Sequence, residues 1–147
     1  MAAMKMLKGA LLCAALPIGL AGAASGAAAE DAMRISVSDG LNEAVFELVE
    51  TKAAKSLYAM LPFTVKVENY SDNEKIFYPP RKVETGASEI ESACPAGTLV
   101  LFSPWGNVVM FYGQAPKYPG LYVLGKAVSG AGRISSMSGS VTARKAK

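Results

Sequence analysis

The sequence predicts a mostly β domain, a barrel or a sandwich, with about eight short strands and one helix. Three observations lead to this prediction. Short segments alternate apolar and polar residues, turn-forming residues separate these segments, and a single segment has helical spacing. The chain shows no internal repeat, no coiled-coil heptad and no Gly-rich phosphate loop.

The first predicted elements are a hairpin and the helix. Residues 33–39 alternate apolar and polar side chains, and residues 43–50 resume the alternation after a Ser-Asp-Gly turn. Residues 51–61 change to helical spacing, where Thr51 could cap the start and Pro62 forces an end. The helix is short, so we expect it to lean on the sheet.

The remaining predicted strands are residues 63–70, 74–78, 97–104, 108–113, 121–127 and 139–145. The second of these stops at Pro79 and Pro80, because proline cannot donate a hydrogen bond to a strand ladder. Residues 83–97 are predicted to form a polar loop, long enough for a binding or edge-covering role. Residues 129–137 could hold one helical turn.

Residues 1–29 are predicted to be a secretory signal peptide, and residues 30–147 the mature domain. Two lysines precede an apolar run, and small residues precede a cleavage site after Ala29. Cleavage after Ala23 is an alternative. An uncleaved anchor is another, disfavoured by the Ala and Gly content and by Pro17. We therefore expect a periplasmic or secreted protein with no stable membrane span after cleavage.

Composition excludes several kinds of chemistry. The predicted signal holds two Lys and no acid, so its removal lowers the net charge from +3 to +1. No basic stripe with interleaved aromatics appears, so we expect no nucleic-acid partner. The chain has no His, which rules out Ser-His-Asp catalysis and histidine metal sites. We predict no metal and no cofactor. Cys94 is expected to be a small apolar residue, because no His can activate its thiol.

Three stretches of the chain share a specific pattern. They read LPFTVKVENYSDNEKIFYPPRKV (61–83), AGTLVLFSPWGNVVMFYG (96–113) and GLYVLGKAVSG (120–130). Together they resemble the bacterial and archaeal cyclophilin-like proteins, a family related to, but divergent from, the peptidyl-prolyl isomerase cyclophilins. The resemblance covers residues 34–142. It implies a closed, eight-stranded antiparallel barrel with one flanking short helix.

The resemblance leaves open whether the chain is an enzyme. The active face of the isomerase cyclophilins uses an Arg, a Phe-Gln pair, a Trp and a His around a proline pocket. This chain has no His, and its Phe-Tyr-Gly-Gln run at 111–114 follows a different strand context. Arg81 is the candidate donor to a prolyl peptide bond. The alternative is a solvated Arg beside Lys82.

The candidate ligand-binding residues are Tyr78, Trp105, Asn107, Tyr112 and Tyr118. Trp105 lies in a predicted turn, where it either closes the barrel end or lines a pocket. Asn107 either permits a left-handed turn geometry or contacts a ligand. The tyrosines could rim a concavity.

Two further expectations bear on the site. Glu74 and Lys75 are expected to be an exposed pair beside a turn. Met110 and Phe111 are expected in the core, on opposite faces of one strand.

Three functions remain open at this point. The first is an exported module that binds a peptide or small molecule without efficient catalysis. The second is a prolyl isomerase that uses Arg81 and an aromatic pocket without His. The third is a structural or accessory protein that binds a partner through the aromatic turn. An isomerase site requires that Arg81, Trp105 and Tyr112 converge on one cavity.

Overall fold

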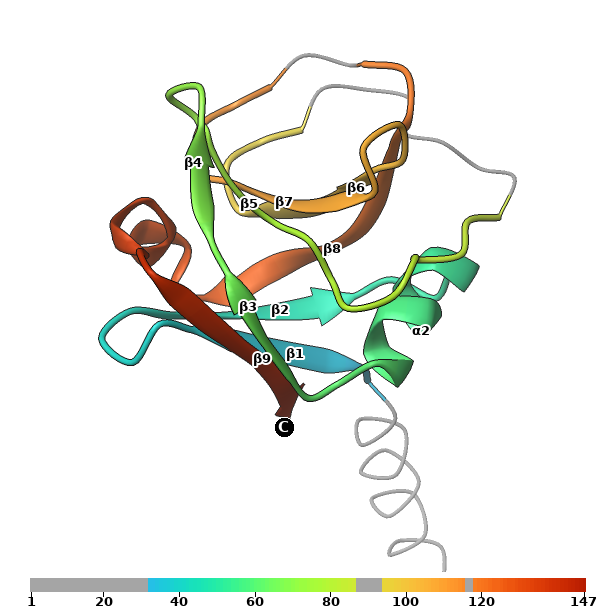
Figure 1. Ribbon diagram of the computed structural model, residues 1–147, viewed down its shortest axis with the longest axis horizontal. Coiled ribbons are helices and arrows are strands. Elements are labelled where there is room, and N and C mark those ends of the chain that lie inside the picture. The colour runs from blue at the N-terminus through green and yellow to red at the C-terminus, as the bar shows by residue number, and fades with distance from the viewer. Residues whose placement is uncertain (1–31, 87–93, 116–117) are drawn as a thin grey trace, which may run out of the picture. The chain divides into compact units, whose positions relative to one another are not determined.

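Nine strands form one antiparallel sheet in a computed structural model that describes residues 32–86, 94–115 and 118–147 (Figure 1). Met33–Lys147 form one unit. The sheet order is β3-β9-β1-β2-β8-β6-β7-β5-β4. The strands are β1 (Arg34–Ser38), β2 (Glu43–Leu48), β3 (Phe63–Lys66), β4 (Glu68–Tyr70), β5 (Glu74–Phe77), β6 (Thr98–Phe102), β7 (Asn107–Phe111), β8 (Leu121–Ser129) and β9 (Ser140–Ala146).

The sheet closes on itself through one bent segment of chain. Its two outermost strands, β3 and β4, are consecutive in sequence and only Val67 separates them. β3 pairs with β9, whereas β4 pairs with β5, so the segment bridges both ends of the sheet. The result is a nearly closed barrel, and β3 and β4 together are the single strand expected at 63–70. Counted in this way, the barrel has the eight strands that the sequence predicts.

The break at Val67 was not predicted. Val67 is buried, and its N–H donates to the Gly139 carbonyl at 2.8 Å, just before β9 begins. Apolar and polar side chains alternate without interruption from Phe63 to Glu68, so the sequence carries no sign of a break at Val67. It arises because the two halves pair with different neighbours.

One helix flanks the barrel, as expected. α2 (Lys52–Ala59) begins at Thr51, whose hydroxyl oxygen accepts a hydrogen bond from the Ala54 N–H at 3.2 Å. Its buried residues are Ala53, Ala54 and Leu57, which join the barrel core. The predicted turn near residue 131 is a 3₁₀ helix, η1 (Ala131–Ser136). No helix in the described ranges is both long and apolar enough to span a bilayer.

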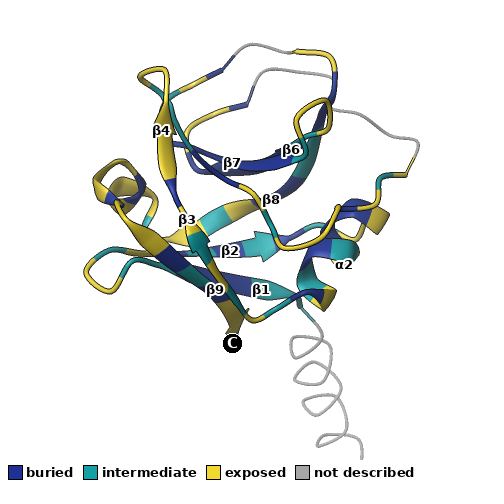
Figure 2. Cartoon of the chain, in the orientation of Figure 1, coloured by how far each residue is buried: buried dark blue, intermediate teal, exposed yellow. Residues whose placement is uncertain are grey.

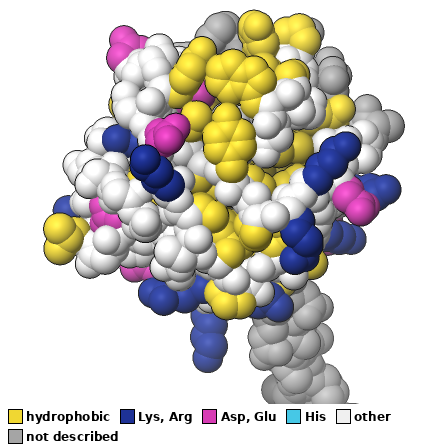
Figure 3. Space-filling view, viewed as in Figure 1, with side chains coloured by type: hydrophobic (Ala, Val, Ile, Leu, Met, Phe, Trp, Pro, Cys, Tyr) yellow, Lys and Arg dark blue, Asp and Glu magenta, His cyan; other side chains and the backbone are white. Residues whose placement is uncertain are grey.

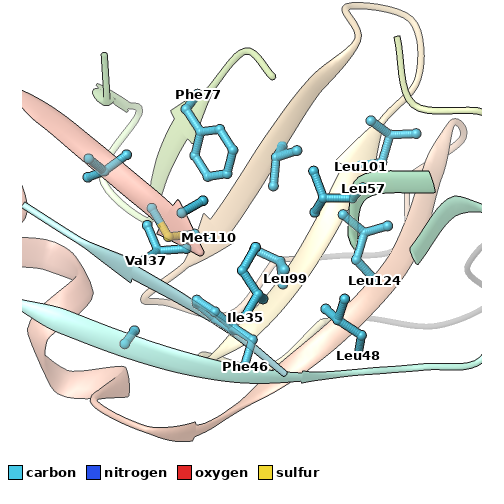
Figure 4. Packing of buried hydrophobic residues seen from close by; sticks show 14 of the residues in the cluster. Ile35, Val37, Phe46, Leu48, Leu57, Phe77, Leu99, Leu101, Met110 and Leu124 are labelled. Carbon is cyan, nitrogen blue, oxygen red and sulfur yellow. The ribbon is translucent and has the colours of Figure 1, made fainter. Parts of the chain in front are cut away.

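The main core fills the barrel. Strands β1 and β2 contribute Ile35 and Phe46, β6 contributes Leu99, β7 contributes Met110, and β8 contributes Leu124; each is fully buried (Figure 4). Ile35 and Phe46 are apolar members of alternating segments, and the core position expected for Met110 is confirmed.

A second, smaller cluster lies on the outer face of β6 and β7. Both strands are buried along almost their whole length, so a single sheet carries apolar packing on two sides (Figure 2). The cluster comprises Ile76, Cys94, Val100, Val109, Phe111, Ala115 and Leu121. Met110 and Phe111 are therefore both buried, as predicted, but they belong to different clusters.

Cys94 joins the second cluster through its side chain and its backbone. Its N–H and carbonyl exchange hydrogen bonds with Ala115, both at 2.9 Å. The thiol is free and buried, and burial raises its pKa. The expectation of an apolar, unreactive packing residue agrees with this position.

Candidate functional site

An open cavity of about 340 Å³ lies above the second cluster, at the outer face of the sheet. Its lining residues come from the β4–β5 hairpin, β6, the β6–β7 turn, β7, the segment between β7 and β8, and the start of β8. They are Tyr70, Ser71, Asn73, Glu74, Phe102, Trp105, Asn107, Val109, Phe111, Ala115, Tyr118 and Leu121. Figure 3 shows hydrophobic side chains gathered in the upper part of one face, over β5, β6 and β7, with Lys and Arg standing to the sides.

Aromatic side chains form much of the wall. The Trp105 ring stands edge-on to Tyr70, with centroids 5.4 Å apart, and to Phe102, with centroids 5.5 Å apart. Phe102 in turn contacts Tyr118, with ring centroids 5.8 Å apart. Edge-to-face pairs hold one another in place, so the wall is set by the rings themselves. Trp105 lines a pocket, the second of the two arrangements considered for it.

Strand β7 supplies the floor. Because side chains alternate along a strand, Asn107, Val109 and Phe111 face outward while Val108 and Met110 face the barrel. Asn107 is only 1% exposed, and its side-chain oxygen Oδ1 has no hydrogen-bond partner within the described part of the chain. A buried acceptor without a partner is costly, so its position at a cavity invites a ligand.

The turn role expected for Asn107 is wrong. Gly106 has the left-handed conformation, with φ of 76°, and its N–H donates to the Phe102 carbonyl at 2.9 Å. Asn107 is already the first residue of β7.

Glu74 lies at the cavity and not on an exposed turn. It is half-buried at the start of β5, opposite Tyr70 on one side and Phe111 on the other. Its removal from water raises the pKa of its carboxyl. Lys75 lies on the other face of β5, and no ion pair joins the two residues. The expectation that Glu74 and Lys75 form an exposed pair beside a turn is therefore wrong.

Three of the predicted site residues lie elsewhere. Tyr78 is half-exposed and lies outside the cavity. Tyr112 packs against the main core, and its hydroxyl donates to Asn69 Oδ1 at 2.7 Å. Arg81 lines a separate polar hollow beside α2. Arg81, Trp105 and Tyr112 do not converge on one cavity. The arrangement expected for an isomerase site is therefore not found.

The hollow around Arg81 is a surface of mixed charge. Lys52 and Glu84 approach to 3.9 Å across it, and Lys55 and Glu50 approach to 3.7 Å. These side chains are largely exposed, so the pairs contribute little to stability. Arg81 itself is exposed, which agrees with the alternative that it is a solvated surface residue.

The sequence predicted Trp105, Asn107 and Tyr118 for the cavity but missed Tyr70, Glu74 and Phe102. These three sit at strand ends, and only the pairing of β4, β5, β7 and β6 brings them together. One signal was present. Glu74 shares an alternating face with Ile76, so a carboxyl interrupts an otherwise apolar face.

Comparison with known proteins identifies the family. The sequence profile described as the Cyclophilin-like family matches residues 37–145, which is most of the chain. The chain belongs to the Cyclophilin-like family. This confirms the resemblance and the barrel that it implied. No match was found among curated proteins.

A solved structure agrees with this fold. The solution structure of a hypothetical protein from Archaeoglobus fulgidus is similar to the cyclophilin-like domain, with a TM-score of 0.65 and 20% sequence identity. The similarity covers 78% of this chain and 95% of the archaeal one. At this identity the likeness concerns the fold alone.

The chemistry open to the cyclophilin-like domain follows from its cavity. The lining offers aromatic surface, one carboxyl group and one unpartnered amide oxygen. Within the described residues, no group of three or more His, Cys, Asp or Glu side chains could hold a metal ion. The rings, the carboxyl and the amide oxygen can hold a ligand through ring contacts and hydrogen bonds.

Proposed function

We propose that this cyclophilin-like domain is an exported binding module that holds a peptide or a small molecule in the aromatic cavity. The observation that carries the proposal is the meeting of aromatic walls with a buried, unpartnered Asn107 oxygen. Small-molecule sites combine apolar lining with a few placed polar groups, and they range over about 300–1,000 Å³. The cavity, at about 340 Å³, lies at the small end of that range.

Export is proposed from the sequence pattern of residues 1–29, which lie outside the described residues. The test is to sequence the N-terminus of protein recovered from the periplasm or medium. We expect it to begin at Glu30. Full-length protein retained in the cytoplasm would contradict export.

The isomerase alternative draws no support from the position of Arg81. A prolyl isomerase must hold the proline ring beside the group that donates to its peptide bond. Here the aromatic cavity and Arg81 lie in separate hollows. We expect no acceleration in a protease-coupled assay on an Ala-Pro peptide at micromolar protein. Acceleration that Arg81→Ala abolishes would favour the isomerase instead.

The chain offers a matched pair of variants to test the binding function. Tyr118 lines the cavity and is 56% exposed, whereas Tyr78 lies outside it and is 50% exposed. Trp105 is the single tryptophan and lines the cavity, so its fluorescence reports directly on occupancy. A screen of peptides and small molecules by Trp105 emission supplies the ligands.

We expect Tyr118→Ala to weaken binding of any hit about fivefold to tenfold, which corresponds to the loss of roughly 1–1.5 kcal/mol of aromatic contact. Tyr78→Ala should leave binding unchanged. Equal effects of the two variants would place the ligand elsewhere. A partner protein that binds stably while no ligand alters Trp105 emission would favour the accessory role.

A further inference from the structure

We propose that the aromatic cavity binds organic cations that carry N–H donors, such as a primary ammonium or a guanidinium group. This inference rests on the proposed binding function and adds the chemical class of the ligand. Its basis is a combination found in one place among the described residues: aromatic faces, a carboxyl without a counter-ion, and an acceptor oxygen without a donor.

The aromatic rings are available to a ligand. Tyr70 is 45% exposed, Trp105 is 50% exposed and Tyr118 is 56% exposed, so part of each ring remains uncovered. Such exposure of three large rings on one cavity is unusual for packing residues. Ring faces carry partial negative charge and attract cations within about 6 Å of the centroid, with Trp the strongest.

The described lining residues carry charge of one sign. Among them Glu74 is the one carboxyl, and none is Lys or Arg. Within the described part of the chain, the ion pairs join Arg34 to Glu47, Lys52 to Glu84 and Lys55 to Glu50, and none involves Glu74. A half-buried carboxylate without a counter-ion is disfavoured, and a bound cation would supply that counter-ion.

The hydrogen bonds at the cavity also indicate that the ligand is a hydrogen-bond donor. The Asn107 Oδ1 atom accepts from no described residue. Two side chains of the lining donate elsewhere: Ser71 donates to Asp72 at 3.4 Å, and Asn73 donates to the Gln114 carbonyl at 3.4 Å. A ligand that brings N–H groups would supply the donor that the Asn107 oxygen lacks. Ammonium and guanidinium groups donate several and accept none.

Other ligand classes fit less well. An uncharged prolyl ring would pack on the aromatic walls but would leave Glu74 and Asn107 desolvated and unpaired. An anion would meet Glu74 with no cation among the described lining residues. A quaternary ammonium would satisfy the rings and Glu74, but it has no N–H for Asn107.

The test compares probes that differ in one property. N-acetyl-arginine amide and N-acetyl-citrulline amide have nearly the same shape, but the citrulline side chain is uncharged. Butylguanidinium and butyltrimethylammonium are both cations, but the second lacks N–H donors. Binding is followed by Trp105 emission and by calorimetry. We expect the arginine amide to bind more tightly than the citrulline amide, by a factor of about ten or more. This is the usual contribution of a hydrogen bond to a charged group.

Two isosteric variants localise the effect. Glu74→Gln removes the cavity carboxylate, and Glu68→Gln removes an exposed one on the same hairpin, outside the cavity lining. Both change the net charge equally. We expect Glu74→Gln to weaken arginine amide binding about tenfold or more, and Glu68→Gln to leave it unchanged. Unaltered circular dichroism and a cooperative thermal transition would confirm that both variants fold.

The probes also separate the source of the cation. Butylguanidinium binding as tightly as the arginine amide supports a free small cation, whereas binding of the amide alone supports a peptide side chain. Equal binding of arginine and citrulline amides, or no effect of Glu74→Gln, would overturn the cation proposal and leave a binding module for uncharged ligands. Equal binding of butyltrimethylammonium would overturn the N–H requirement. No response to any probe or peptide would overturn the binding function as well.

Discussion

Asp39 ties two distant turns together. Its carboxylate accepts hydrogen bonds from the N–H groups of Leu41 at 2.8 Å and Asn42 at 2.7 Å, within the β1–β2 turn. It also accepts from the Ser138 N–H at 3.0 Å, just before β9. These backbone donors favour the ionised form and hold the pKa of Asp39 well below its ordinary value.

Asp39 is expected to stabilise the fold only where it is ionised. Because its folded pKa lies below the ordinary 3.8, its contribution is fully present above that value and is lost as the pH falls below it. Asp39→Asn should lower the melting temperature at neutral pH and flatten its decline in acid. The measurement is thermal unfolding of both proteins across this pH range. Parallel curves for the two proteins would contradict the assignment.

Glu74 is expected to act in the opposite direction. Desolvation raises its folded pKa above the ordinary 4.5, so between these two values the folded chain holds a proton that the unfolded chain has released. Stability should therefore fall as the pH rises through this window, and Glu74→Gln should remove that fall. Thermal unfolding of the ligand-free proteins checks it. A steeper fall in the variant would show that another group titrates there.

At the scale of elements, one glycine allows the paired strands β2 and β8 to approach each other closely. Gly125 in β8 pairs with Leu48 of β2 and Leu99 of β6, and β8 shifts register against β6 directly beside it. A Cβ atom on Gly125 would overlap the backbone carbonyl oxygen of Glu47, which cannot move aside as a side-chain end can. This steric limit explains the glycine in the Leu-Gly-Lys sequence.

Gly125→Ala is expected to destabilise the domain by about 1–3 kcal/mol, the usual cost of forced backbone shifts in a packed interior. Gly132→Ala is the matched control, because a Cβ there meets nothing within 4 Å. Chemical denaturation of both variants provides the measurement. Similar stabilities of the two variants would mean that the β8 backbone can shift at Gly125 at little cost.

The sequence predicted the elements better than the site, for a physical reason. Alternation and helical spacing are local properties, so β1, β2, α2 and β7 follow from neighbouring residues. The cavity depends on pairings between strands far apart in sequence, which bring Phe102 and Tyr70 together through Trp105. Arg81 was assigned to the site wrongly for the same reason, because the chain after Pro80 places it beside α2 and not in the aromatic cavity.

At the scale of the whole molecule, one sheet separates two apolar clusters of unequal size. Leu99 belongs to the large barrel core, and Leu121 belongs to the smaller outer cluster beneath the open cavity. Leu99→Ala is expected to cost about 2–5 kcal/mol, with Leu121→Ala near the lower end because the outer site can relax. Denaturation followed by circular dichroism gives both values. A larger loss for Leu121→Ala would reverse this order of importance.

The near closure of the barrel has a consequence for self-association. An open sheet presents unpaired backbone groups along its outermost strands, and these are templates for pairing with another chain. Here those strands are β3 and β4, which are short and joined end to end through Val67. β5, the strand beside β4, is followed closely by Pro79 and Pro80, whose nitrogens cannot donate. The described sheet therefore offers little unpaired backbone as a template for fibril growth.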